Sequence, residues 1–583
     1  MLTNMLVITA IWMLIFIIVS GIGFFLLKML GVTIAKRETL FSAFWLGWAS
    51  IIMFLQIWHI FSPINTVALV IVLLAGVISV LLGHSRFETI IFNHSGNNKL
   101  VSSIFIVCTI LFILWLANQA TGKLTSYDTG LYHLGTIRWM QSYPIVIGLG
   151  NLHPRFAYNS SYFLFVALLD LLWWRSDFFN LSNGLLLSVI SVQIGAYIFT
   201  SMTNKDNLKS YQVLGILLAA SLLPYYFTLT NNTSSDLPVF ILGLMVGIHV
   251  FKFLFNDKTH EESRLDALII VILCATGISI KLSFAVFSCL AVVVVMFTLL
   301  IYKPTATQVE SRFYNMVWAL ALSVLILIPW GLRGIMLSGY IAYPIPTMPL
   351  DVRWRIPEQL AKTDARWIKS WAQQPYNSPD NVLGNWKWFK PWLQRMVQQR
   401  LEVVLPILLF LMGIIIYLTS ARAKIKSVYR DMLFLMIPII ALVFWFFTAP
   451  NIRFAGGSFW LLGAGTMAIS IHHVADKKLL EIVSLSSLLL AIFAFVISAR
   501  LHGWVVYPGP DQGFYPTPKF QVHQFQTRSG LTIFVPNTGD KCWDAPLPCT
   551  PYPNPDLATI ESGNISSGFF MQASQSLAPG KKE

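Results

Sequence analysis

The sequence predicts an all-α membrane protein that crosses the bilayer about 14 times. Apolar runs of roughly twenty residues, the length at which a helix spans a bilayer, recur along the whole chain. Only 11% of the residues are charged, against about 25% in a soluble domain. Because backbone N–H and C=O groups find no water in lipid, helices are the expected element.

Basic loops set the direction of these spans. Segments 422–430 and 472–478 are basic and favour the cytoplasmic side. The apolar segment 161–174 fits the resulting alternation only as an interfacial or re-entrant piece. The expected spans are 5–27, 41–60, 66–82, 101–116, 181–200, 211–226, 237–255, 266–280, 283–302, 315–331, 401–419, 432–448, 456–471 and 479–497.

Five regions follow from this topology. They are N-terminal spans at 1–100, a transmembrane core at 101–331 with an external loop at 119–180 that we expect to be catalytic, an external Trp-rich loop at 332–400, C-terminal spans at 401–499, and a small external tail at 500–583. Cys542 and Cys549 lie close together in a Pro-rich part of the tail and are expected to form a disulfide, which indicates an oxidising compartment. The formal charge of +14 fits basic cytoplasmic loops and lipid headgroups, so we expect no nucleic-acid partner.

A polar stretch at 126–160 interrupts the apolar sequence soon after the span at 101–116. It begins Ser-Tyr-Asp-Thr-Gly-Leu-Tyr-His and places ionisable side chains at one membrane edge. We predict that Asp128 is the catalytic base of a membrane glycosyltransferase and that His133 assists it or helps to hold a phosphate, because an acceptor hydroxyl must lose its proton. Two alternatives stay open: Asp128 caps the following helix, and His133 is a structural polar residue.

Cations near the same edge are candidates for holding a phosphate leaving group. Arg453, in Asn-Ile-Arg-Phe-Ala-Gly-Gly, is the first choice because a short loop holds it at the membrane surface and a guanidinium grips phosphate bidentately. Arg155, in His-Pro-Arg-Phe, and Lys281 follow. Lys281 interrupts an apolar run, where an ionisable residue is a functional candidate. For each cation the alternative is snorkelling to lipid headgroups. Further side chains predicted to bind substrate are Arg138, His153 and Asn159.

Asp236 is a second carboxylate on the expected external side, directly before the span at 237–255. Together with Asp128 it could ligate a divalent cation, Mg²⁺ or Mn²⁺, that would support a phosphate leaving group. Capping of its own helix is the alternative. The sequence contains no phosphate-cradling glycine loop, zinc-ligand spacing or nucleophile elbow. We therefore expect no other cofactor and a substrate that is activated beforehand.

Tryptophans crowd the region 332–400, and 364–371 is predicted as a short amphipathic helix. Two interpretations apply to these indoles. They form an aromatic belt at the lipid headgroups, or they stack against the faces of sugars. The residues concerned are Trp354, Trp367, Trp371, Trp386, Trp388 and Trp392.

These features resemble the GT-C class of integral membrane glycosyltransferases. The resemblance rests on Asp128 in Tyr-Asp-Thr-Gly-Leu-Tyr-His, on Asp236 at the start of a later span, and on a large external loop followed by spans and a polar tail. It implies a polyprenyl-phosphate-linked sugar donor, a glycan or lipid acceptor, contact with membrane lipids, and an active site on the periplasmic or extracellular side of the bacterial cytoplasmic (inner) membrane. The class usually carries its acid after the first span, whereas here about three spans precede the span that leads to Asp128.

Three stretches also resemble a poorly characterised family of large bacterial membrane proteins. They are Gly-Leu-Tyr-His, Gly-Leu-Gly-Asn-Leu-His-Pro-Arg-Phe and Asn-Ile-Arg-Phe-Ala-Gly. Other functions stay open. An O-antigen-type polysaccharide polymerase or ligase would use external arginines and a histidine without a catalytic aspartate. A transporter or lipid flippase would place ionisable residues at the middle of the membrane, and a structural or assembly protein would need none of this chemistry.

Overall fold

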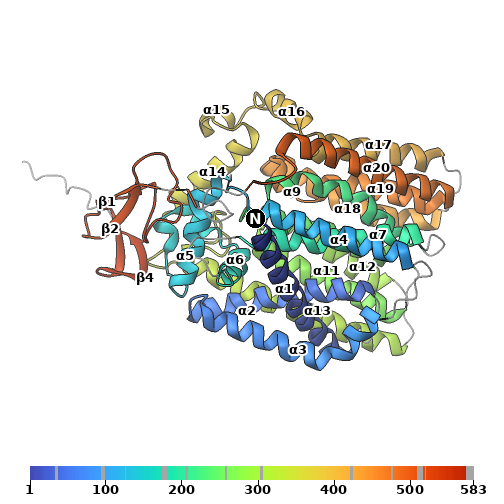
Figure 1. Ribbon diagram of the computed structural model, residues 1–583. Coiled ribbons are helices and arrows are strands. Elements are labelled where there is room, and N and C mark those ends of the chain that lie inside the picture. The colour runs from blue at the N-terminus through green and yellow to red at the C-terminus, as the bar shows by residue number, and fades with distance from the viewer. Residues whose placement is uncertain are drawn as a thin grey trace, which may run out of the picture.

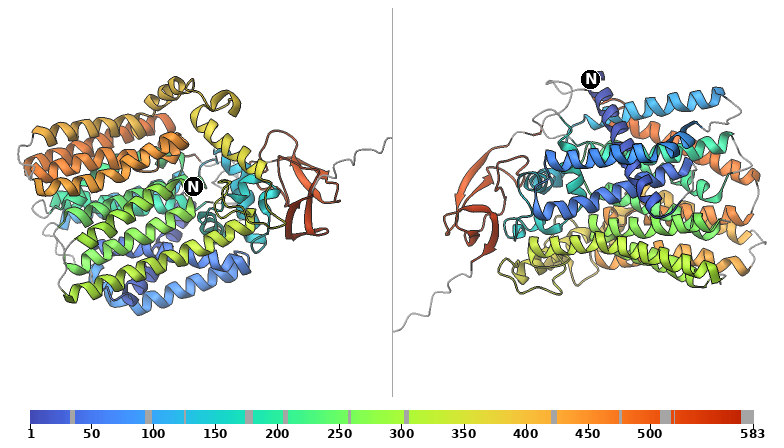
Figure 2. Two further views of the ribbon diagram at one scale, coloured as in Figure 1. Left: turned by 180° about the vertical axis from the view of Figure 1, so that it is seen from behind. Right: turned by 90° about the horizontal axis from the view of Figure 1, so that it is seen from below.

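Long helices lie side by side in one bundle, short helices cover one end of it, and a small β-structure lies beyond them (Figures 1 and 2). We call this covered end the site end. The structure is a computed structural model. It describes residues 1–32, 37–92, 99–124, 126–173, 180–203, 208–256, 259–301, 306–419, 425–474, 477–507, 517–518 and 520–572.

The bundle is built from helices that match the apolar runs of the sequence. Those of the first half are α1 (Leu2–Met29), α2 (Arg37–Phe61), α3 (Thr66–Phe92), α4 (Lys99–Ala120), α7 (Ser182–Thr203), α8 (Ser210–Leu217), α9 (Leu223–Thr228) and α10 (Asp236–Phe255). Those of the second half are α11 (His260–Ile280), α12 (Ala285–Ile301), α13 (Ala306–Ser338), α17 (Leu405–Thr419), α18 (Ile425–Thr448), α19 (Ser458–Val474) and α20 (Lys477–His502).

Within the described residues, 12 helical segments are long and apolar enough to cross a membrane. The chain is therefore a helical polytopic membrane protein, as predicted. Two further helices, α19 with 17 residues and α20 with 26, lie beside them (Figure 1). The count of about 14 spans stays a prediction. In the segment 161–174, α6 (Tyr162–Asp170) has nine residues, too few to span a bilayer, and residue 174 lies outside the described ranges.

Small residues let neighbouring helices approach to backbone contact. A Cβ atom added at Gly463 of α19 would lie 2.2 Å from the carbonyl oxygen of Pro406 in α17. One added at Gly23 of α1 would lie 1.7 Å from the carbonyl oxygen of Ala43 in α2. Such close pairs are typical of helices that associate within lipid, where packing replaces the hydrophobic effect as the driving force.

Short elements form the layer at the site end. The predicted amphipathic helix 364–371 lies within α14 (Glu358–Gln373), which confirms it. Trp388 and Trp392 are buried beside residues of α18, whereas Trp386 is 63% exposed. The elements of this layer are η1 (Thr129–His133), α5 (Leu134–Ser142), η2 (Leu149–Asn151), η3 (Pro154–Tyr158), α6, α14, α15 (Pro379–Val382) and α16 (Phe389–Gln398).

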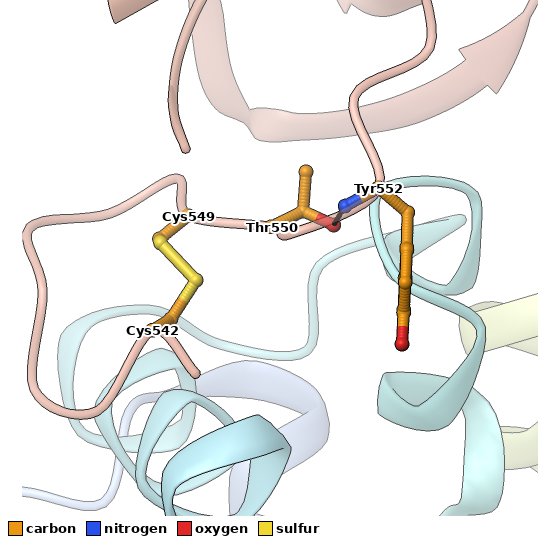
Figure 3. The surroundings of a disulfide bond; sticks show 4 residues. All are labelled: Cys542, Cys549, Thr550 and Tyr552. Atoms are coloured by element: carbon orange, nitrogen blue, oxygen red, sulfur yellow. Dashed lines mark hydrogen bonds between the residues drawn. A yellow bond between two sulfur atoms is a disulfide. The ribbon is translucent and has the colours of Figure 1, made fainter. Parts of the chain in front are cut away.

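The tail folds into two antiparallel hairpins, which the all-α prediction did not include. Strand β1 (Val522–Gln526) pairs with β2 (Thr532–Pro536), and β3 (Leu557–Glu561) pairs with β4 (Asn564–Met571). Cys542 and Cys549 form a disulfide in the loop between the hairpins (Figure 3). The strands pack Ile533 and Phe569 into an apolar cluster with Trp139 of α5. The tail is thus attached to the layer of short helices.

Candidate functional site

Asp128 lies between two arginines. Its Oδ1 accepts a hydrogen bond from Nη1 of Arg155 at 2.9 Å, and its Oδ2 accepts one from Nη1 of Arg453 at 3.0 Å. Asp128 stands directly before η1, yet its side chain makes no capping hydrogen bond there. The carboxylate therefore pairs with the two arginines and does not cap the helix. Burial alone would raise the pKa of Asp128, but Arg453, His133 and Arg155 hold it below its ordinary value.

Tight turns hold both arginines in place. Arg453 lies in η8 (Ile452–Phe454), between α18 and α19, where the side chain of Asn451 accepts a hydrogen bond from the Arg453 backbone N–H at 3.3 Å. Arg155 lies in η3, where Nδ1 of His153 accepts one from the Arg155 backbone N–H at 3.2 Å. These side-chain hydrogen bonds fix the backbone at each arginine. Two segments far apart in the sequence thereby each direct a guanidinium group to Asp128.

A second ion pair lies next to the first. The amine of Lys281, between α11 and the short turn η6 (Leu282–Phe284), donates to the carboxylate of Asp236 at the start of α10. Here too the carboxylate binds a cation. Lys281 Nζ lies 4.5 Å from the ring centre of Phe454, and the guanidinium carbon of Arg453 lies 4.9 Å from it. The shared ring brings the two pairs together.

We call Asp128, Arg155, Asp236, Lys281 and Arg453 the Asp128 cluster. It holds three cations and two carboxylates, and its side chains are partly open: that of Arg453 is 40% exposed and that of Asp128 19%. The excess of positive charge suits an anionic ligand. The described part of the chain contains no group of three or more His, Cys, Asp or Glu side chains placed to hold a metal ion. The Mg²⁺ or Mn²⁺ site at Asp128 and Asp236 stays a prediction, and it would require the carboxylates to release their cations.

His133 lies behind Asp128 and is buried. Its Nδ1 lies 2.8 Å from Oγ1 of Thr233, and its ring packs against Phe163. Burial lowers its pKa to about 4, against the raising effect of Asp128 and Asp236. His133 is thus neutral near pH 7. It closes a five-residue π-helical segment, a form of helix that is frequent at functional sites.

Three residues predicted to bind substrate, Arg138, His153 and Asn159, form hydrogen bonds with other residues of the chain. Arg138 binds the two carboxylate oxygens of Asp544 at 2.5 and 2.7 Å, and Asp170 at 3.4 Å, so it joins the tail to α6. Burial, reinforced by Arg155, lowers the pKa of His153 to about 3. Asn159 has φ 52°, and its Nδ2 donates to the carbonyl oxygen of Trp330 at 2.7 Å. Among the described contacts, none joins Arg138 to the Asp128 cluster.

A second carboxylate near Arg155 was not predicted as a site residue. Asp364 of α14 accepts a hydrogen bond from Tyr158 Oη at 3.2 Å, and Tyr158 follows Arg155 in η3. Burial raises the pKa of Asp364, opposed by Tyr158, Arg155 and Tyr343. Asp128 and Asp364 therefore differ in their tendency to ionise. The sequence marks Asp364 only as part of an amphipathic helix, and its hydrogen-bond partner Tyr158 lies 206 residues away in the sequence.

The tail also borders the site, which the sequence did not indicate. Trp543, beside the disulfide, donates from its backbone N–H to the carbonyl oxygen of Gly130 at 2.8 Å. A Cβ at Gly130 would lie 2.7 Å from the Trp543 ring, so a glycine is needed here. Tyr127 donates from its hydroxyl to Asp540. Tyr552, which follows the disulfide loop (Figure 3), packs on His153 at 5.4 Å between ring centres. The tail therefore holds both sides of the loop that carries Asp128.

Other buried ionisable pairs lie within the bundle. His249 of α10 and Asp266 of α11 are 2.8 Å apart, and His473 of α19 lies 2.9 Å from Asp431 of α18. Along α11, Asp266 lies about 20 Å from Lys281 at the site end. These pairs belong to another part of the bundle, and no sequence pattern predicted them as site residues.

Comparison with known proteins places the chain in a family. Residues 5–460 match a family model described as Domain of unknown function (DUF8201). The chain belongs to this family. The matched range includes every residue of the Asp128 cluster and stops before the tail. Neither the curated proteins nor the solved structures give a match to this DUF8201 chain.

Proposed function

We propose that this DUF8201 chain is a membrane glycosyltransferase. It moves a sugar from a polyprenyl-phosphate-linked donor to a glycan or lipid acceptor at the external face of the bacterial cytoplasmic membrane, in the assembly of cell-surface glycan. One observation carries the proposal: the carboxylate of Asp128 lies between the guanidinium groups of Arg155 and Arg453 at the end of an apolar bundle. A base and two phosphate ligands are thus within reach of one lipid-linked substrate.

In the proposed reaction the donor phosphate binds Arg155 and Arg453. These arginines then turn from Asp128 to the phosphate oxygens, and the pKa of Asp128 rises as the cations leave it. Asp128 accepts the proton of the acceptor hydroxyl while the acceptor oxygen bonds to the anomeric carbon of the sugar. The bond between that carbon and the phosphate oxygen breaks, and the electron pair leaves with the phosphate, where the arginines stabilise its charge.

Lys281 and Asp236 have a supporting role in this proposal. Lys281 lies on the same aromatic ring as Arg453 and adds a third positive charge to the cluster. Asp236 balances that charge in the absence of substrate. Asp364 is a second candidate for proton transfer, because its raised pKa favours the protonated form that a general acid needs.

An O-antigen-type polymerase or ligase is the second candidate. It is favoured by the lowered pKa of Asp128, which makes the carboxylate a weak base as long as both arginines bind it. In that case Asp128 only positions Arg155 and Arg453, and the arginines alone support the leaving phosphate.

The variants D128N and R453Q separate the two candidates. Each is expressed from a plasmid in cells that lack the chromosomal gene, and the surface glycan is quantified. The glycosyltransferase proposal predicts that D128N lowers glycan transfer by roughly 10²–10⁴-fold, as expected for a missing general base, and that R453Q lowers it by roughly 10²–10³-fold. Retained transfer in D128N together with loss in R453Q would favour the ligase. The exposed pair Arg366–Asp380 of the Trp-rich region supplies the control R366Q.

A further inference from the structure

A small cavity lies behind the Asp128 cluster, where the ends of α2 and α13 meet the layer of short helices. Its volume is about 20 Å³, enough for one water molecule, so a larger group enters only if the lining side chains move apart. Arg155 and Arg333 both line it, and no carboxylate does. Arg155 binds Asp128 on its other side, so the cavity adjoins the proposed active site without containing its base.

Arg333 is the unusual residue in this wall. It is fully buried within α13, at 0% exposure, and it forms no ion pair with any described carboxylate. Its Nη1 donates to Nδ1 of His59 at 2.7 Å, and its Nε donates to Oδ1 of Asn159 at 3.3 Å. Both partners are neutral acceptors. A guanidinium stays charged in proteins, and a buried charge without a counter-ion is costly.

Four hydrogen-bond donors of the cavity wall have no partner among the described residues. They are Nη2 of Arg333, Nε1 of Trp139, the hydroxyl of Ser160 and Nε2 of His59, which carries the ring proton because Nδ1 accepts from Arg333. All four residues are more than nine-tenths buried, and all four line the cavity. An indole N–H can only donate, and so can a guanidinium. The donors without partners require a hydrogen-bond acceptor, and the buried charge of Arg333 requires a counter-ion. A bound anion would supply both.

We infer that this cavity binds one oxyanion of the phosphate class, held by Arg333, Trp139 and Ser160. The group is either a free phosphate or the headgroup of a lipid phosphate that enters past Arg155. The inference does not depend on sugar transfer, because it rests on donors outside the Asp128 cluster. It predicts that the full-length chain binds phosphate with a saturable affinity that these three side chains determine.

Thermal unfolding of the purified full-length chain in lipid nanodiscs tests the inference. The unfolding temperature is followed against inorganic phosphate, and separately against a polyprenyl phosphate with the matching polyprenol as control. A specific ligand raises the unfolding temperature in a saturable way. Phosphate also stabilises proteins nonspecifically by exclusion from their surface, but that effect is shared by all variants and does not saturate.

Three variants report on the cavity. R333Q removes the charge, S160A removes one hydroxyl, and W139F keeps an aromatic ring but removes the indole N–H. Each is expected to weaken phosphate binding by roughly tenfold or more, the usual effect of losing a hydrogen bond to a charged group. W139F and S160A keep the test valid if R333Q does not fold. R366Q, which removes an exposed arginine on α14, should bind as the wild type does.

The outcomes are distinct. Saturable stabilisation by inorganic phosphate that weakens in the variants supports a free-phosphate site. Stabilisation by the polyprenyl phosphate that weakens in the three variants, with none by inorganic phosphate or by polyprenol, supports a lipid-headgroup site in the cavity. If neither ligand gives a saturable shift, or if the shifts are equal in wild type and all three variants, water alone fills the cavity and the inference is wrong.

Discussion

At the scale of single residues, charge pairing organises the site. The sequence predicted Asp128, Arg155 and Arg453 as site residues because each lies in a short polar segment beside an apolar span. The structure brings these three together. It could not be predicted that Asp364 lies near Arg155, since that depends on how α14 folds back over η3. Local sequence indicates which residues are near the membrane edge, whereas their mutual contacts depend on tertiary packing.

His133 gives a pH-dependent test of this packing. Unfolded, its pKa is about 6.5, whereas burial lowers it to about 4 in the folded chain. Between these values the unfolded state binds the extra proton, so stability is lost as pH falls below about 6.5 and is constant above it. At pH 5 the loss due to this residue is about 2 kcal/mol. Unfolding measured from pH 7.5 to pH 5 should therefore have a shallower slope in H133Q than in wild type.

A suitable control is H523Q, on the exposed face of β1. It should leave the wild-type slope unchanged. Equal slopes in wild type and H133Q would mean that His133 is accessible to protons, and the buried site geometry would be wrong.

At the scale of elements, apolar runs were predicted well and the tail was not. Each predicted span overlaps a helix of the bundle, because a long apolar run has one stable backbone conformation in lipid. The tail strands have only five to eight residues each. In so short a run, the alternation of apolar and polar residues is too brief to predict a strand. Packing on α5, which lies far from the tail in the sequence, helps to hold the strands, whereas the disulfide joins cysteines only 7 residues apart and was predicted.

The attachment of the tail can be tested at Arg138. Its bonds to Asp544 and Asp170 link the tail to α6, and the Arg138 side chain is 26% exposed. R138Q should lower the local stability of the tail by about 1 kcal/mol, allowing for solvent screening. Hydrogen exchange of residues 520–572 should then be roughly fivefold faster.

The matched control is R528Q, which breaks a more exposed pair with Asp556 inside the tail. It should change exchange less than R138Q does. Unchanged exchange in R138Q would show that the tail does not depend on this link.

At the scale of the whole molecule, close helix packing fixes the bundle that carries the site. Hydropathy predicted where the apolar helices lie in the sequence but not which of them lie side by side. The positions of glycines determine which helices can pack closely. Gly463 permits backbone contact between α19 and α17. Helix α19 directly follows the loop that carries Arg453. The position of Arg453 therefore depends on a contact within the bundle.

Gly463→Ala tests that contact. The added Cβ would lie 2.2 Å from the Pro406 carbonyl oxygen, so the helices must separate. We expect a loss of about 1–3 kcal/mol, as for overpacking of a core, although alanine is the better helix former. Thermal unfolding of the purified chain measures it. Gly331→Ala is the control, since its nearest neighbour would lie 3.6 Å away. Equal stability of the two variants would contradict the packing of α17 against α19.

The central claim is that the Asp128 cluster transfers a sugar from a lipid phosphate. Mass spectrometry of lipid-linked sugars, extracted from cells that lack the gene and from the same cells carrying wild type or D128N, tests it most directly. If the cluster transfers the sugar, a polyprenyl-phosphate-linked sugar accumulates in the deletion strain and with D128N, at equal protein level, and falls to its normal level with wild type. If no such lipid accumulates in the deletion strain, or if D128N clears it as wild type does, the claim is contradicted.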